Sequence, residues 1–433
     1  MRHINYLVLL LVACSVGACS SPKNDTKDAY PMFWTWLDYQ PGMNFDSICT
    51  IMNEAGIDGV MLNAPTPDDY RAAIPIAQKH GIEVYAWLWT MNPEHDRDAI
   101  LKEHPEWFSV NRNGQSLADT TAYVDYYKFM CPALPEVREF IKKKIEAYCE
   151  VEGLNGIAID YNRFVDVILP TTLWPKYGIV QDQEYPQWDF GYHPAMIEKF
   201  KAEKWLQFRC DQITEVANMI ADVVHSYGKK MAASPFPTPK MASKMVRQDW
   251  GKWNLDIVFP MVYHNFYTED ISFISDCMIE DVRDKNPKTT LYCGLMVADD
   301  IENAMDAALN HGAEGISIFT VSALRTPESR AMFKAYADSV RAVRAENNGV
   351  NPALSKSTKV TNPFESMDIL NRINAKIKEL ANVPIPNIAD YKLVNEKGAT
   401  KYYEVKELNT GKTFCVDFYF YGGILSGWNV TVK

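Results

Sequence analysis

The sequence predicts an α/β fold: a TIM (β/α)8 barrel followed by a small C-terminal α+β module with an antiparallel sheet. Between residues 31 and 345, short apolar runs rich in β-branched and aromatic residues alternate with amphipathic stretches, as in β-α units around a parallel sheet. The apolar runs number eight, the strand count of a TIM barrel. The chain has 433 residues, of which 47% are hydrophobic, enough for one barrel core and an appendage.

The expected strands are short apolar runs bounded by turn residues, and the expected helices are longer stretches with apolar residues at helical spacing. The strands span 31–36, 59–63, 83–89, 156–160, 230–235, 256–263, 290–295 and 315–320. The helices span 46–55, 68–80, 135–151, 205–227, 300–311 and 327–343. A doubly wound open sheet is the alternative fold, but no glycine-rich phosphate-binding loop follows the first strand.

The first 19 residues predict a lipoprotein signal peptide. Their apolar run, residues 6–18, is too short to span a bilayer as a transmembrane helix. It ends in Val-Gly-Ala before Cys19, which resembles a bacterial lipobox, so we expect Cys19 to be lipidated. Cys14 is the alternative lipid site, and secretory cleavage without lipidation is the alternative process.

The segments that follow divide the chain further. Residues 20–29 form a polar tether, and the barrel is expected to span 30–345. The expected location is the cell envelope, at the outer membrane or cell surface, with the lipid anchor as the one membrane contact.

After the barrel, residues 346–362 are polar and predict a linker to a module at 363–433. The module should hold one helix and four strands. The helix is expected at 365–380 and the strands at 391–395, 402–408, 413–421 and 428–432. The module either binds glycan or packs on the barrel, and packing is favoured because nothing in it forms a recognisable site.

Composition excludes several classes of function. The formal net charge is -11 and no basic stripe is present, so nucleic acid is not an expected partner. No His-x-His, HExxH or Gly-x-Ser-x-Gly motif occurs, so no metal and no cofactor are expected. Seven further cysteines lack zinc-ligand spacing and are expected to be buried reduced thiols. They are Cys49, Cys131, Cys149, Cys210, Cys277, Cys293 and Cys415.

Asp160 is the leading catalytic candidate because it ends the apolar run 156–160. In barrel enzymes, catalytic groups occupy the carboxyl ends of strands and the loops after them. Arg163 lies three residues further along and is expected to lower the pKa of Asp160. Asp160 would then be ionised, as a nucleophile or general base must be.

Glycoside hydrolysis needs a second carboxylate, and three candidates lie near strand ends. Asp249 belongs to the connection after the fifth expected strand, and Glu269 follows the sixth. Asp38 follows the first. Asp256 is a poorer candidate because it begins a strand and should face the opposite end of the barrel.

Two long connections, about 90–130 and 161–204, are expected to shape the site. Aromatic floors and amide, hydroxyl or imidazole groups at strand ends suit a hydroxyl-rich ligand. The expected substrate-binding residues are Trp36, Asp38, Asn63, Trp89, Tyr161, Arg163, Ser234, Tyr263 and His264.

Several segments, in order along the chain, together resemble the bacterial glycosyl hydrolase-like 10 family. They are GIEVYAW (81–87), HPEW (104–107), CPALPEVR (131–138), GIAIDY (156–161), SPF (234–236) and LDIVFPMVY (255–263). The resemblance implies a TIM barrel acting on glycans, with Asp160 in the active site. It also implies that peptidoglycan glycan strands are among the possible substrates. Two departures affect the expected substrate: Asn162 to Phe164 replaces a second Asp or an aromatic-proline pair, and Met261 replaces a polar residue.

These observations predict a glycosidase that hydrolyses an extracytoplasmic glycan by two-carboxylate acid/base chemistry. The glycan would be a polysaccharide, an oligosaccharide or a peptidoglycan glycan strand. The alternative is a non-catalytic glycan-binding lipoprotein on a degenerate barrel, because no glutamate follows the fourth or seventh expected strand.

Overall fold

The chain was analysed as a computed structural model, which describes residues 32–433 apart from 41, 202–203, 348, 350, 352–361, 366, 399 and 422–423. The predicted signal peptide, Cys19, the tether and most of the predicted linker lie outside the described residues. None of the helices that the structure describes is both long and apolar enough to cross a bilayer.

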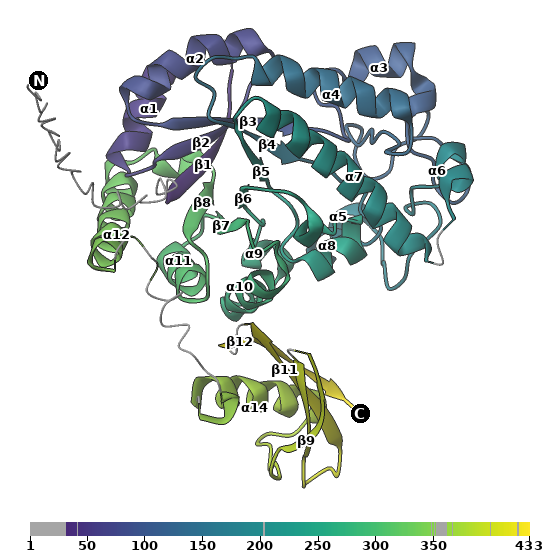
Figure 1. Cartoon of the computed structure of the whole chain (residues 1–433), viewed down its shortest axis with the longest axis vertical. Coiled ribbons are helices and arrows are strands. Elements are labelled where there is room, and N and C mark those ends of the chain that lie inside the picture. Colours follow the sequence, from purple (N-terminus) through teal and green to yellow (C-terminus); the bar gives the residue numbers. More distant parts are fainter. Residues whose placement is uncertain are drawn as a thin grey trace, which may run out of the picture. The chain divides into compact units, whose positions relative to one another are not determined.

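Eight parallel strands pair in sequence order and close into a barrel, which confirms the predicted fold class (Figure 1). Three of the predicted strands, the second, third and fourth, have the predicted bounds. The strands are β1 (Phe33–Asp38), β2 (Gly59–Asn63), β3 (Glu83–Trp89), β4 (Gly156–Asp160), β5 (Lys230–Ala233), β6 (Ile257–Val258), β7 (Thr290–Met296) and β8 (Gly315–Phe319).

The fifth and sixth strands are shorter than predicted. β5 ends two residues before Pro235, and β6 ends two residues before Pro260. Proline has no backbone N–H and cannot donate to the strand ladder. The chain after β6 rejoins the barrel only at an isolated bridge between Met261 and Gly294.

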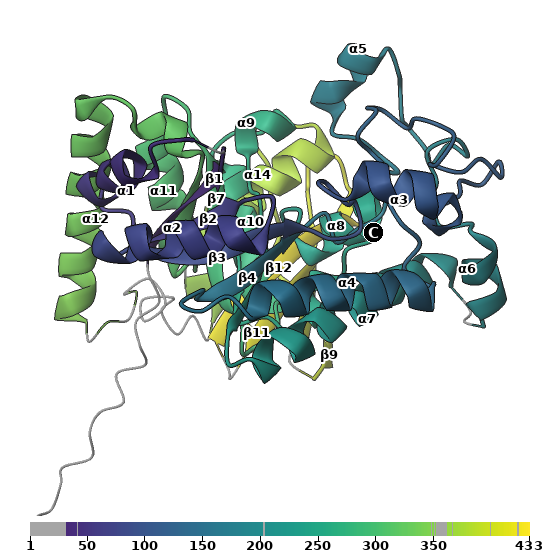
Figure 2. The ribbon, with the colours of Figure 1, turned by 90° about the horizontal axis from the view of Figure 1, so that it is seen from above.

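Helices lie around the strands (Figures 1 and 2). All six predicted barrel helices are present, within three residues of their predicted bounds. The α-helices of this region are α1 (Phe45–Glu54), α2 (Pro67–Lys79), α3 (Arg97–Glu103), α4 (Pro135–Cys149), α5 (Trp174–Tyr177), α6 (Pro194–Lys199), α7 (Trp205–Ser226), α8 (Pro239–Val246), α9 (His264–Tyr267), α10 (Ser272–Asp284), α11 (Ile301–Asn310) and α12 (Pro327–Glu346). Short 3-10 helices are η1 (Pro105–Trp107), η2 (Thr171–Leu173), η3 (Trp250–Lys252) and η4 (Val321–Leu324).

Local sequence explains where α2 starts. Thr66 and Asp69 form a capping box in which each side chain bonds to the backbone N–H of the other residue. Pro67 occupies the first turn, where a missing N–H costs no helical hydrogen bond. The capping box and Pro67 therefore determine where α2 begins.

Large aromatic side chains fill the amino-terminal part of the barrel interior. The rings of Trp34 and Tyr85 lie 4.7 Å apart, and those of Phe259 and Tyr292 lie 5.1 Å apart. Gly59 leaves room for Trp34, since a Cβ atom there would lie 2.7 Å from the indole. Side chains alternate along a strand, so Trp36 and Asp38 follow Trp34 into the interior. By the same alternation Trp87 and Trp89 follow Tyr85, and the polar inward residues lie at the carboxyl-terminal end.

The C-terminal module consists of η5 (Pro363–Glu365), α14 (Met367–Ala381) and a four-stranded antiparallel sheet of order β12-β11-β10-β9 (Figure 1). Its strands are β9 (Lys392–Lys397), β10 (Thr400–Lys406), β11 (Thr413–Tyr421) and β12 (Ile424–Val432). Ile373 and Ile377 of α14 are in one buried cluster with Phe414, Val416 and Phe418 of β11. One sheet face is therefore covered by the helix, as the alternation in β11 requires.

The seven cysteines within the described residues are free thiols. Six are buried and Cys415 is half-buried, so the expectation of buried reduced thiols is confirmed for six of them.

Candidate active site

Asp160 ends β4 inside the barrel, and its side chain is almost wholly buried, with 7% of its surface exposed. Oδ2 accepts a 3.1 Å hydrogen bond from the indole Nε1 of Trp87, and Oδ1 accepts a 2.6 Å bond from the backbone N–H of Tyr161. The backbone carbonyl of Asp160 accepts from both the N–H and the hydroxyl of Thr90. The carboxyl group is thus held by Trp87 of β3 and by Tyr161, and the backbone of Asp160 is held by Thr90.

Burial raises the pKa of Asp160 to about 6, against the combined effect of its hydrogen bonds and Arg163. Arg163 lowers the pKa of Asp160, as expected, but its effect is smaller than that of burial, so the pKa is not kept low. The guanidinium of Arg163 lies 2.8 Å from Asp166, and this buried carboxylate neutralises much of its charge. Desolvation therefore outweighs the attraction of the arginine.

Arg163 lies beneath the site, where its guanidinium carbon is 5.0 to 5.6 Å from the centres of four aromatic rings. Tyr161 contributes one of these rings, and its backbone has a φ of 49°, in the left-handed region that side chains rarely adopt. The centres of the Tyr161 and Trp89 rings lie 4.2 Å apart, and the ring planes are tilted by 35°. The residues after Asp160 thus form an aromatic wall with Arg163 behind it.

Glu94 is a carboxylate at the barrel mouth that was not among the predicted site residues. Its Oε2 accepts a 2.6 Å hydrogen bond from Nδ2 of Asn63, the last residue of β2. Its charge contributes to raising the pKa of Asp160 and also that of Asp38. The last residues of β1, β2 and β4 and this loop glutamate therefore form one electrostatically coupled group.

Sequence reasoning missed Glu94 because the search was restricted to strand ends. Glu94 lies five residues beyond Trp89, in the long connection that had been expected to shape the site. The adjacent pair Glu94-His95 in that connection was the one available signal, and a charged pair in a loop is usually solvated.

Asp249 and Glu269 are placed differently from the expectation. Asp249 lies 2.6 Å from Lys252, whose ammonium also approaches Asp211 of the outer helix α7 at 3.9 Å. Glu269 is exposed after α9, and its backbone N–H bonds to the carbonyl of His264. Neither residue has a contact that links it to Asp160, whereas Glu94 is electrostatically coupled to it.

Aromatic rings form the other side of the mouth. Phe319, at the end of β8, lies 5.9 Å from Trp36 and 5.9 Å from Tyr263. Burial and the nearby charge of Asp160 raise the pKa of the Tyr263 hydroxyl, so this hydroxyl is neutral and lies close to Asp160. Of the predicted substrate-binding rings, Trp89 and Tyr263 are half-buried at this end of the barrel, whereas Trp36 is 1% exposed and lies within the core.

His264 and Ser234 are less accessible than predicted. His264 is buried, and its Nε2 lies 2.9 Å from Oδ2 of Asp300. Ser234 is also buried, and its hydroxyl contacts the sulfur of Met61 at 3.7 Å. Both lie below the mouth rather than on its surface.

The connections after β3 and β4 are joined by a buried charge cluster. Asp189 binds Arg112 at 2.9 Å, bonds to Arg209, and lies 3.8 Å from Arg247. These arginines come from three different segments, and Arg247 also lies 2.9 Å from Glu184. In both views α3 and α6 of these connections lie on the same side of the barrel (Figures 1 and 2).

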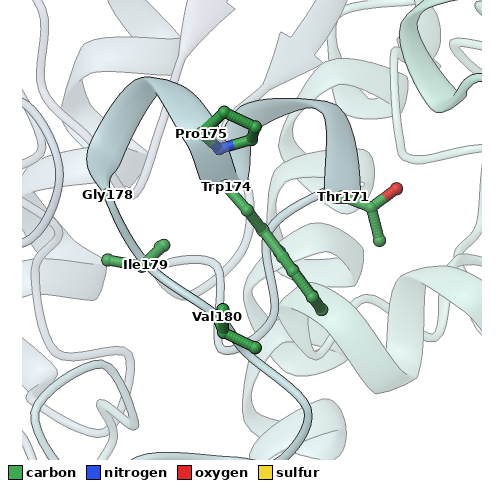
Figure 3. A pocket seen from close by; sticks show the side chains of 6 residues that line it. All are labelled: Thr171, Trp174, Pro175, Gly178, Ile179 and Val180. Carbon is green, nitrogen blue, oxygen red and sulfur yellow. The ribbon is translucent and has the colours of Figure 1, made fainter.

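An open depression of about 370 Å³ lies on α5 (Figure 3). The flat ring of Trp174 forms part of its wall, together with Pro175, Ile179 and the 64% exposed Val180. The neighbouring η2 is joined to α9 by a 2.6 Å bond from Thr172 to the carbonyl of Phe266. The depression thus lies beside the segment that follows Tyr263.

No group of three or more His, Cys, Asp or Glu side chains with metal-binding geometry occurs among the residues that the structure describes. The polar side chains at the mouth are the carboxyl groups of Asp38, Glu94 and Asp160, the amide of Asn63 and the imidazole of His95.

The chain is similar in structure to several solved proteins. It resembles the PgaB (BpsB) glycoside hydrolase domain from Bordetella bronchiseptica at 14% identity and a TM-score of 0.49, covering 70% of this chain and 98% of that one. The GH20 exo-β-N-acetylglucosaminidase from Vibrio harveyi matches at 11% identity and a TM-score of 0.42, over 75% of this chain and 57% of that one. The β-N-acetylhexosaminidase from Bacteroides fragilis matches at 12% and 0.40, over 71% and 66%.

No curated protein sequence matches the chain. The family model for glycosyl hydrolase-like 10 matches residues 52–308, which span β2 to most of α11 and include Asp160 and Glu94. This match covers more than half of the chain, and the chain therefore belongs to the glycosyl hydrolase-like 10 family.

Proposed function

We propose that the protein is a glycoside hydrolase acting on an extracytoplasmic glycan, with Asp160 as the general acid and Glu94 as the nucleophile or general base. The observation that supports this most directly is the coupling of two carboxylates with different surroundings at one barrel mouth. Paired carboxylates in unlike environments are the basis of glycoside hydrolysis.

Asp160 suits the acid because burial favours the neutral, protonated form of its carboxyl group. Its pKa of about 6 keeps it largely protonated in mildly acidic solution. Glu94 suits the ionised partner because its side chain is 28% exposed and accepts a hydrogen bond from an amide N–H. This assignment reverses the role that the sequence predicted for Asp160.

The proposed reaction moves one proton and one bonding electron pair. Asp160 gives its proton to the glycosidic oxygen, and the bond from that oxygen to the anomeric carbon breaks with its electrons going to the oxygen. Glu94 either forms a bond to the anomeric carbon or takes a proton from the water that does so. In the first case water later hydrolyses the glycosyl-enzyme, with Asp160 acting as base.

Substrate contacts follow from the walls of the mouth. Trp89 and Tyr263 are half-buried and offer rings against which sugar C–H bonds pack. Asp38 is exposed at the end of β1 and offers a carboxylate to sugar hydroxyls. We keep these three residues in the proposed binding site. Trp36, Arg163, Ser234 and His264 are placed behind it because they are buried.

The test is a screen of the full mature chain against oligosaccharides, polysaccharides and peptidoglycan glycan strands, with reducing ends and binding measured together. Asp160→Asn and Glu94→Gln should each lower kcat by about 10²- to 10⁴-fold. A substrate with a good leaving group, such as a nitrophenyl glycoside, needs no acid to leave. It should therefore partly restore the activity of Asp160→Asn but not that of Glu94→Gln. Glycan binding without turnover, unchanged in Asp160→Asn, would favour the non-catalytic glycan-binding protein instead.

We also propose that the protein is exported and anchored to the cell envelope through a lipid on Cys19. The support is the apolar run followed by the lipobox-like motif. Loss of membrane association in Cys19→Ala is the expected result, and unchanged association would contradict the proposal.

A further inference from the structure

Asn63 lies between Glu94 and His95, with contacts to both. It is 5% exposed at the end of β2. Its Nδ2 donates to Oε2 of Glu94 at 2.6 Å, and its Oδ1 lies 3.1 Å from Nε2 of His95. One amide group therefore touches two consecutive residues of the loop after β3.

The hydrogen-bonding capacity of an amide determines which atoms carry hydrogen here. Oδ1 of Asn63 can only accept, so Nε2 of His95 must carry a hydrogen and donate it. Nδ2 can only donate, so Oε2 of Glu94 accepts. Nε2 of His95 lies 3.6 Å from Oε2 of Glu94, beyond hydrogen-bond distance, so His95 acts on Glu94 through Asn63.

We propose that Asn63 and His95 are positioning residues: Asn63 holds Oε2 of Glu94, His95 orients the amide of Asn63, and Oε1 is thereby the reacting atom. The inference rests on the proposed glycosidase function and adds the device that orients its ionised carboxylate. With Oε2 engaged, the lone pairs of Oε1 are the ones free to face the substrate.

The charges around this amide agree with such a role. Asp38 pairs with Asn63 in the ladder between β1 and β2, so another carboxyl group lies beside the trio. Burial and the charge of Glu94 raise the pKa of Asp38, and His95 lowers it. The hydrogen bond from Asn63 to Glu94 and the effect of His95 on Asp38 therefore both favour negative charge on this group of carboxylates.

In the proposed step, the electron pair on Oε1 forms a bond to the anomeric carbon as the bond to the leaving oxygen breaks, and Asp160 supplies the proton to that oxygen. If water attacks instead, Oε1 takes the proton from water. In both cases Asn63 and His95 exchange no proton and touch no substrate atom.

Kinetics of Asn63→Leu in the full mature chain provide the first test. Loss of an oriented donor should lower kcat on the order of 100-fold. The KM should change little, because the ground-state contacts of the substrate remain. Asn218→Leu is the matched control: Asn218 on α7 also makes two side-chain hydrogen bonds, to Lys252 and Asn254, and its loss should leave kcat unchanged. A kcat in Asn63→Leu equal to that of the wild type would overturn the proposal.

Sodium azide separates positioning from a general loss of structure. In Glu94→Ala, azide can occupy the space of the missing carboxylate and form a bond to the anomeric carbon, giving a glycosyl azide. If Asn63 acts through Glu94, adding Asn63→Leu to this variant should leave the azide-supported rate unchanged. A further loss of tenfold or more would assign Asn63 a structural role and overturn the inference.

The imidazole of His95 gives a readout that does not depend on turnover. Nitrogen-15 NMR of the wild type should show a hydrogen on Nε2 of His95, and Asn63→Leu should remove this preference. If no glycan is cleaved but this hydrogen is found, the proposed function fails while the hydrogen-bonded trio stands. A wild-type His95 without a hydrogen on Nε2 would contradict the trio itself.

Discussion

The indole Nε1 of Trp87 donates a 3.1 Å hydrogen bond to Oδ2 of Asp160 inside the barrel. Trp87 is an inward residue of β3, and Asp160 ends the neighbouring strand β4. The hydrogen bond stabilises the ionised carboxylate, so it lowers the pKa of Asp160, while burial raises it to about 6. The pKa of Asp160 is thus set by opposing effects: the hydrogen bond from Trp87 lowers it and desolvation raises it.

Trp87→Phe should therefore shift the pH dependence of the reaction. Removing the indole N–H removes an interaction that favours the ionised form, so the pKa of Asp160 should rise further. As an acid, Asp160 acts while protonated, and the alkaline limb of the kcat/KM profile should move from near pH 6 to higher pH. A shift to lower pH would contradict the role of acid. Trp107→Phe, at a half-buried tryptophan of η1, is the control and should leave the limb in place.

Asp281→Asn should stabilise the protein at neutral pH. Asp281 of α10 is fully buried, and neither carboxyl oxygen has a hydrogen-bond partner. Desolvation raises its pKa well above the usual value, so the folded state binds a proton that the unfolded state releases at neutral pH. The raised pKa of Asp281 favours folding most at a pH below the pKa that this carboxyl group has in the unfolded state. This contribution to the free energy of unfolding is lost as the pH rises towards the pKa in the folded state.

We expect Asp281→Asn to raise the free energy of unfolding by roughly 1 kcal/mol at pH 7. The gain should shrink as the pH falls to about 4, close to the unfolded pKa of a carboxyl group. Denaturant unfolding at the two pH values measures this, with the exposed Asp222→Asn as the control. A gain in the free energy of unfolding that is larger at pH 4 than at pH 7 would show that folding does not raise the pKa of Asp281.

Asp189→Asn should weaken the two long connections beside the site. The substitution removes the negative charge that Arg112, Arg209 and Arg247 share. Uncompensated buried charge costs about 3–5 kcal/mol when one partner of a buried ion pair is lost. Limited proteolysis should cut the connection after β4 first, and thermal unfolding should begin at a lower temperature. Asp182→Asn, at an exposed residue bonded to Tyr185, should leave both measurements near the wild type.

Much of the barrel could be predicted from local patterns. The second, third and fourth strands were predicted with their observed bounds because each is a buried apolar run between turn residues. The sixth was predicted too long, because Pro260 interrupts an apolar run that otherwise reads as one strand. The helix α10 was not predicted at all, although its buried face includes Ile274, Cys277 and Met278.

The candidate site was predictable only in part. Asp160, Asn63 and Asp38 could be found because position along a strand determines which end of the barrel a residue occupies. Glu94 could not, because it lies in a loop and meets Asn63, which donates to it from another strand, only in the folded chain. Arg163 lowers the pKa of Asp160 as expected, but burial outweighs it, and Asp166 pairs with Arg163 inside the fold.

By itself, the sequence determined the alternation of strands and helices, and with it the position of Asp160 at the carboxyl end of β4. Only the tertiary structure decided that Glu94 is electrostatically coupled to Asp160 and that Asp160 is buried. The physical reason is that strand periodicity is a local property of the chain. Desolvation and charge coupling instead depend on side chains from β1, β2, β3 and the loop after β3, which meet only when the barrel closes.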